Sequence, residues 1–228
     1  METAKRQLLW ECGLVTGVLL GLLHLLYSFR SVGWIQTYLS AMVAILFLYV
    51  PVIVLLKKRR PVDFLDRGWP EYRRSLLWCV GTLAAVFIPY AFIAHYWMLW
   101  FYGYHQFSPA GLDPAGGGKF GSFVLYQLLM VALPEEFFFR GYLQSTLNRI
   151  WPKRWKILGT WVGPAWLVTA LVFAFAHSVV ILRWWHFSIF FPALLFGWLR
   201  EKTGTLTAPI LWHAFANIFM DWFVRSYS

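Results

Sequence analysis

The sequence is poor in charged residues and in cysteine. Asp, Glu, Lys and Arg make up 13% of the 228 residues and hydrophobic types 60%, whereas a soluble domain has about 25% and about 45–50%. Cys12 and Cys79 lie in different apolar stretches without CxxC spacing, so they support neither a disulfide framework nor a thiolate zinc site. The chain also has 15 Trp, 21 Phe and 11 Tyr. This composition excludes a soluble, disordered or coiled-coil protein and indicates a polytopic membrane protein.

Long uncharged runs alternate with short basic clusters. We predict seven helices, near residues 8–29, 33–56, 75–102, 120–148, 158–181, 184–199 and 204–224. A helix needs about 20 apolar residues to cross a bilayer, whereas a barrel strand would need about 10 in an alternating pattern. The predicted fold class is therefore all-α, a polytopic transmembrane bundle of about seven (six to eight) helices. We expect the first helix to stay uncleaved, because no small-x-small site follows a short apolar core.

The basic residues, which give a net charge of +10, follow this alternation. With a cytoplasmic N-terminus, 15 of the 20 Lys and Arg residues fall on the cytoplasmic side and four on the other. Those four are Arg30, Lys119, Arg183 and Arg225, and Arg140 lies within a helix. This bias is the positive-inside pattern, so we expect an integral multi-pass protein with a cytoplasmic N-terminus. The clusters form no aromatic-interleaved patch, and we expect no nucleic-acid partner.

Three ionisable residues lie close together in the predicted helix 120–148. Each such group costs roughly 2.5–3.5 kcal/mol at the membrane centre, so each requires a reason. Glu136 and Arg140 are four apart with the acid first, which favours a pair, and Gln144 continues the stripe. Glu135 lies about 100° around the helix and needs a partner elsewhere. Either the pair orients helix packing while Glu135 caps the half-helix after Pro134, or Glu135 is a base in a low-dielectric site.

Two later predicted helices also carry polar clusters. His177 ends a run of Phe and Ala in the helix 158–181, where the small alanines permit close approach. His213 and Asn217 are four apart in the last helix and therefore lie one above the other. A single membrane histidine is more often a hydrogen-bonded packing residue. Three polar clusters on three separate helices are harder to explain by packing and favour a functional site.

These clusters resemble, in their order, the motif set of a known family. The motifs are Glu135-Glu136-x-x-x-Arg140, Phe173-x-x-x-His177 and His213-x-x-x-Asn217. They are similar to those of the CAAX protease and bacteriocin-processing family, glutamate-dependent intramembrane endopeptidases that include the type II CAAX prenyl protease. The resemblance covers roughly residues 123–219, including the lead-in 203–210, whereas residues 1–110 match only a generic hydrophobic pattern.

The resemblance implies an intramembrane endopeptidase of glutamic type. Such an enzyme would cleave a protein or peptide near a membrane-proximal or lipidated C-terminus, without a cofactor or metal. The implied catalytic residues are Glu135 and His177, which would activate water, and His213 and Asn217, which would stabilise the oxyanion; Glu136 and Arg140 would support them. We expect one integrated membrane domain, with N-terminal helices of unassigned role in residues 1–110 and a catalytic core in residues 111–228. A bacterial cell membrane is the expected location, with the bilayer as partner.

Three other classes of function stay open at this point. A divalent-metal-dependent membrane protease could use the same Glu, His and Asn cluster, although the sequence has no HExxH motif. A membrane transporter could also line its path with Glu, Arg and His, although we find no inverted repeat. A non-catalytic immunity or scaffold protein would keep the fold without the activity.

Overall fold

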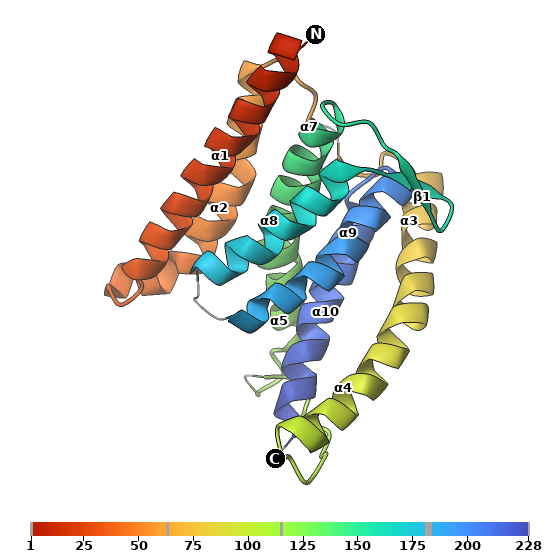
Figure 1. Ribbon diagram of the computed structural model, residues 1–228. Coiled ribbons are helices and arrows are strands. Elements are labelled where there is room, and N and C mark those ends of the chain that lie inside the picture. The colour runs from red at the N-terminus through yellow and green to blue at the C-terminus, as the bar shows by residue number, and fades with distance from the viewer. Residues whose placement is uncertain (1, 63, 115, 181–183, 228) are drawn as a thin grey trace.

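The computed structural model describes residues 2–62, 64–114, 116–180 and 184–227, and within them seven helical segments follow one another (Figure 1). They are α1 (Glu2–Ser28); α2 (Gly33–Lys57); α3 (Trp69–Thr82), η1 (Leu83–Phe87) and α4 (Ile88–Phe101); α5 (Phe120–Tyr126), η2 (Gln127–Ala132), α6 (Leu133–Glu136), η3 (Phe137–Gln144) and α7 (Ser145–Asn148); α8 (Pro164–Val180); η4 (Trp184–Ile189) and α9 (Phe190–Thr203); and α10 (Thr207–Arg225). Two short strands, β1 (Trp155–Ile157) and β2 (Thr160–Val162), form the other regular elements of the described residues. The predicted all-α transmembrane bundle is confirmed.

Within the described residues, four helical segments are long and apolar enough to cross a membrane. These segments are Glu2–Ser28, Gly33–Lys57, Trp69–Phe101 and Phe120–Asn148. Large apolar side chains such as Trp10, Leu77 and Phe92 are exposed on their outer faces. A surface of this kind suits lipid, because a helix satisfies its own backbone hydrogen bonds and needs no water on its outer face. In Figure 1 the N-terminus and the C-terminus lie at opposite ends of the bundle.

Several predicted boundaries are wrong. The first helix begins at Glu2, not at residue 8, and the third begins at Trp69, not at residue 75. Pro70 stands in the first turn of α3, where the missing amide proton leaves no helical hydrogen bond unmade, so this proline marks the start of a helix. The sixth helix continues to Thr203 and is capped by Gly204 at φ +82°. Arg183, one of the four basic residues expected on the side opposite the cytoplasm, lies outside the described residues.

The largest error concerns the predicted helix 158–181, which begins only at Pro164. Residues 155–162 instead form the antiparallel β1–β2 hairpin, with Ile157 paired to Thr160. Leu158 and Gly159 form its turn with φ of +46° and +75°. Two successive positive φ values characterise the type I′ turn, whose twist matches that of the flanking strands. The uncharged run around Gly159 and Gly163 predicts a helix, but its first part forms the hairpin.

The main apolar core joins the N-terminal helices to the later ones. Leu19 of α1 and Phe47 of α2 belong to the same buried cluster as Phe138, Phe139 and Phe173. The Phe47 ring lies 5.8 Å from that of Phe138 and 5.7 Å from that of Phe139. The first two helices therefore pack directly against the segment that follows the two glutamates.

Candidate active site

The helix that carries Glu135 and Glu136 changes its winding on both sides of them. The α-helical turn Leu133–Glu136 stands between two π-helical segments, η2 and η3. Pro134 has no amide proton to donate to the preceding turn, which accounts for a change of hydrogen-bond register at this point. π-Helical turns within helices are frequent at functional sites.

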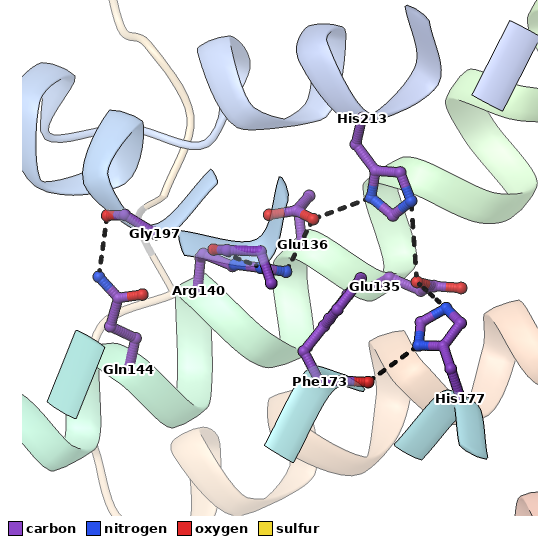
Figure 2. Close-up of polar contacts among 9 residues, drawn as sticks. Glu135, Glu136, Arg140, Gln144, Phe173, His177, Gly197 and His213 are labelled. Atoms are coloured by element: carbon purple, nitrogen blue, oxygen red, sulfur yellow. Dashed lines mark hydrogen bonds and ion pairs between the residues drawn. The ribbon is translucent and has the colours of Figure 1, made fainter. Parts of the chain in front are cut away.

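Glu136 is the centre of a fully buried charge cluster (Figure 2). Its Oε1 atom accepts hydrogen bonds from Arg140 Nη1 and from His213 Nδ1, each at 2.9 Å. Both Glu136 and Arg140 are 0% exposed. Arg140 Nη2 also donates to the Ala193 carbonyl at 3.1 Å, and its guanidinium lies 4.3 Å from the centre of the Phe173 ring. The pair anticipated from the four-residue spacing therefore joins its own helix to α8, α9 and α10.

The polar stripe continues beyond Arg140. Gln144 Nε2 donates to the Gly197 carbonyl at 3.1 Å and to Glu201 Oε1 at 2.6 Å, and Asn148 Nδ2 donates to the same oxygen at 2.7 Å. A Cβ atom on Gly197 would lie 2.7 Å from Trp166 and 2.8 Å from Gln144 Oε1, so this close approach requires glycine. The sequence indicated the stripe but not its partner Glu201. That residue lies among other charged residues at the end of α9, so nothing in the sequence distinguished it.

Glu135 meets two histidines from other helices. Its Oε2 atom lies 3.7 Å from His177 Nε2 and 3.9 Å from His213 Nε2 (Figure 2). The Glu135 side chain is 14% exposed, and its Oε2 atom makes no hydrogen bond with any described residue. Both distances exceed the length of a direct hydrogen bond. The structure therefore brings together the three polar clusters that the sequence places on three helices.

Hydrogen bonds at Nδ1 set the orientation of both imidazole rings. His177 Nδ1 lies 2.9 Å from the Phe173 carbonyl oxygen, which can only accept, so Nδ1 carries the proton. His213 Nδ1 donates in the same way to Glu136. In the neutral form, each ring thus presents an unprotonated Nε2 to Glu135. Phe196 stacks on His213 with ring centres 5.0 Å apart, and this contact restricts rotation of the imidazole ring.

Asn217 reaches the site from α10, one turn beyond His213. Its Nδ2 atom donates to Gln127 Oε1 at 3.1 Å, and one Nδ2 hydrogen is left for another acceptor. Sequence reasoning missed Gln127. Gln127 could have been identified as an isolated amide side chain in the apolar run before Pro134. Polar side chains inside membranes are costly and usually bind a partner.

An apolar cavity of about 600 Å³ opens beside these groups. His177, His213 and Asn217 form part of its wall. The rest is largely aromatic and aliphatic, including Phe87, Tyr90, Phe173, Leu195, Phe196 and Trp212. A cavity of this size, apolar with a few convergent polar groups, is typical of a site for a small or extended organic ligand.

The side chains around Glu135 do not have the spacing of a metal site. Structural and catalytic zinc sites use three or four His, Cys or carboxylate ligands at about 2.0–2.3 Å. Among the described residues, no group of three or more His, Cys, Asp and Glu side chains is arranged to hold an ion. The Glu135 oxygen and the two histidine nitrogens are spaced instead at 3.7 Å and 3.9 Å.

The fold and the site define a class, an α-helical membrane protein with a buried Glu–His cluster beside an apolar cavity. Residues 118–219 match the family model described as type II CAAX prenyl endopeptidase Rce1-like. The resemblance inferred from the motifs is thereby confirmed. Comparisons with curated proteins and with solved structures found no match.

Proposed function

We propose that the protein is an intramembrane endopeptidase of glutamic type, which hydrolyses a peptide bond with water activated by Glu135. The approach of His177 and His213 to one oxygen of Glu135 is the observation that carries this proposal. The Rce1-like match supports the protease class, because the family is one of endopeptidases. The glutamic mechanism rests on the geometry.

The distances around Glu135 suit one water molecule shared by the carboxylate and His177. Glu135 takes a proton from this water as the oxygen attacks the carbonyl carbon of the scissile bond. A C–O bond forms, and the carbonyl electron pair moves to the oxygen. When the intermediate collapses, the C–N bond breaks and the leaving nitrogen takes the proton back from Glu135. The products are a carboxylic acid and an amine, and no covalent enzyme intermediate forms.

His213 and Asn217 are the proposed donors to the developing oxyanion. Because His213 Nδ1 is committed to Glu136, Nε2 can donate only when the ring is protonated. Asn217 donates its remaining Nδ2 hydrogen, and Gln127 fixes the orientation of the amide. Glu136 and Arg140 act as supporting residues that hold His213 in place.

The proposed substrate is a protein or peptide that is cut near a membrane-proximal or lipidated C-terminus. The apolar wall of the 600 Å³ cavity supports it, because such a wall accommodates an apolar segment or a lipid chain. The experiment is cleavage of a library of peptides with apolar or lipidated C-terminal regions by the full chain in liposomes, with products identified by mass spectrometry. We expect cleavage confined to these peptides; a reconstituted protein that cleaves none of them would contradict the proposal.

We propose that residues 1–110 and 111–228 form one integrated membrane domain, the second part being catalytic. The shared core described above supports this arrangement. A second contact does so too, since Glu11 of α1 accepts hydrogen bonds from Arg60 and, at 3.0 Å, from Tyr142. On this proposal, the N-terminal helices brace the segment that carries the glutamates.

Chelation is expected to leave the cleavage rate unchanged, because water activation is assigned to Glu135 and not to a bound ion. The measurement compares turnover before and after dialysis against EDTA and 1,10-phenanthroline, with elemental analysis of the purified protein. A rate that falls with chelation and returns with added Zn²⁺ would favour the metal-dependent alternative.

A cytoplasmic N-terminus in a bacterial cell membrane is the proposed orientation. It is supported by the 15 basic residues assigned to one side. The two termini lie at opposite ends of the bundle (Figure 1), so reporter fusions after Arg67 and after Tyr227 are expected to report opposite compartments. A cytoplasmic signal from both fusions would overturn this topology.

A further inference from the structure

A second cavity, of about 510 Å³, lies away from Glu135 and Glu136. It is lined by Arg74, Trp78, Lys153, Gly159, Thr160, Trp161, Glu201 and Lys202. These residues come from α3, from the hairpin and the chain before it, and from the end of α9, which meet near one end of the bundle (Figure 1). The proposed hydrolysis uses none of them.

The cavity has an excess of positive charge. Arg74, Lys153 and Lys202 face a single acid, Glu201. Its carboxylate is already engaged, because Oε2 pairs with Lys153 Nζ at 2.5 Å and Oε1 accepts the two amide hydrogen bonds of the polar stripe. The positive charges of Arg74 and Lys202 are therefore not neutralised by any acid of the cavity wall. An anionic ligand suits such a cavity.

The groups of the cavity are held in place. Lys202 Nζ lies 4.4 Å from the centre of the Trp78 ring, and a Cβ atom on Gly159 would be only 3.4 Å from that ammonium nitrogen. Arg74 Nη2 donates to the Thr203 carbonyl. Thr160 is only 5% exposed, and its hydroxyl has no hydrogen-bond partner within the described part of the chain. A buried hydroxyl normally finds a partner, and Thr160 forms part of the cavity wall, so a ligand in the cavity is a candidate partner for it.

The exposed side chains of the hairpin suit the edge of the membrane, and a hairpin at that depth would place the cavity there as well. Trp155, Leu158 and Trp161 are exposed on it, Leu158 to 81%. Tryptophan concentrates at the boundary between lipid tails and water, the depth at which lipid phosphates lie. An exposed leucine at the tip of a turn, beside two tryptophans, is suited to insertion into that boundary.

We propose that this cavity binds the phosphate group of an anionic phospholipid. Arg74 and Lys202 donate charge-assisted hydrogen bonds to the phosphate oxygens, and the Thr160 hydroxyl donates a third. Trp78 and Trp161 contact the apolar part of the headgroup region. Basic cavities between transmembrane helices bind lipid headgroups in this manner. The bound lipid would hold the hairpin against α3 and α9.

The test measures lipid binding to the full chain in detergent by native mass spectrometry, with phosphatidylglycerol and with phosphatidylcholine. The variants are Lys202→Gln and Thr160→Val, and the matched control is Lys156→Gln, which removes a hairpin charge outside the cavity. We expect wild type to prefer phosphatidylglycerol. Its affinity should fall about tenfold in Lys202→Gln, by a smaller factor in Thr160→Val, and not at all in the control.

Melting temperatures show which variants are folded. If Lys202→Gln is unfolded, Thr160→Val alone decides, because it removes only a hydroxyl from a side chain of nearly the same shape. An equal phosphatidylglycerol affinity in the folded variants, or no preference over phosphatidylcholine, would overturn the proposal. A parallel titration with inorganic phosphate separates the two sources of phosphate. Binding of inorganic phosphate that depends on Thr160 and Lys202, without lipid binding, would overturn the lipid assignment.

Discussion

Glu135→Gln is expected to lower the cleavage rate by a factor of about 10²–10⁴, the range for loss of a general base. Glutamine keeps the size and most of the hydrogen-bonding capacity of glutamate, but it cannot take a proton from water. Its melting temperature should stay close to that of the wild type, because Glu135 Oε2 makes no hydrogen bond with a described residue. The measurement is the initial rate on a peptide that the wild type cleaves, together with thermal unfolding in detergent.

His177→Ala is the companion variant for this prediction. It removes the nitrogen 3.7 Å from Glu135 Oε2 while leaving the carboxylate in place. We expect a reduced rate with substrate binding retained, since His177 is assigned to the water and not to the substrate chain. A Glu135→Gln variant that cleaves at the wild-type rate would show that Glu135 is not the base. The packing interpretation of this helix would then be favoured.

Glu136→Gln is expected to destabilise the protein by about 3–5 kcal/mol, the cost of leaving a buried charge without its partner. The reason is Arg140, which is 0% exposed and whose Nη1 atom pairs with Glu136 at 2.9 Å. The variant should also lose activity, because Glu136 positions His213. The readout is the melting temperature in detergent, which should fall much further than for Glu135→Gln.

A double variant provides the matched control for that prediction. Glu136→Leu with Arg140→Leu removes both charges, and replacing a buried ion pair by apolar residues is often close to neutral. We expect the double variant to melt at a higher temperature than Glu136→Gln while remaining inactive. A Glu136→Gln protein with wild-type melting temperature would contradict the assignment of this pair as a stabilising contact.

The order of the helices was predictable because bilayer thickness sets the length of an apolar run. The four candidate spans follow such runs. The errors in the predicted bounds lie at the helix ends, as in α3, which begins at Trp69 with Pro70 in its first turn. The hairpin was not predictable in this way. Leu158 adopts a positive φ that is rare for a side chain of its type, and the uncharged run around Gly159 carries no helix-period signal to distinguish the two structures.

The site was predictable within each helix but not between helices. A four-residue spacing places Glu136 beside Arg140, and the structure shows that contact. The distance of Glu135 from His177 depends on how three helices pack, which no local spacing determines. For the same reason, the bond from His213 to Glu136 and the Gln127 contact were missed. The resemblance to a family supplied the roles, and the packing supplied the partners.

The most direct test of the central claim is a comparison of membrane proteins from cells that carry the wild type and cells that carry Glu135→Gln. Both variants should be present at equal levels, which is checked by quantifying the protein itself. We predict new C-termini, created by cleavage close to a membrane segment, that appear with the wild type and disappear with Glu135→Gln. If the same C-termini appear with both proteins, hydrolysis does not depend on the Glu135 carboxylate, and the proposed mechanism is wrong.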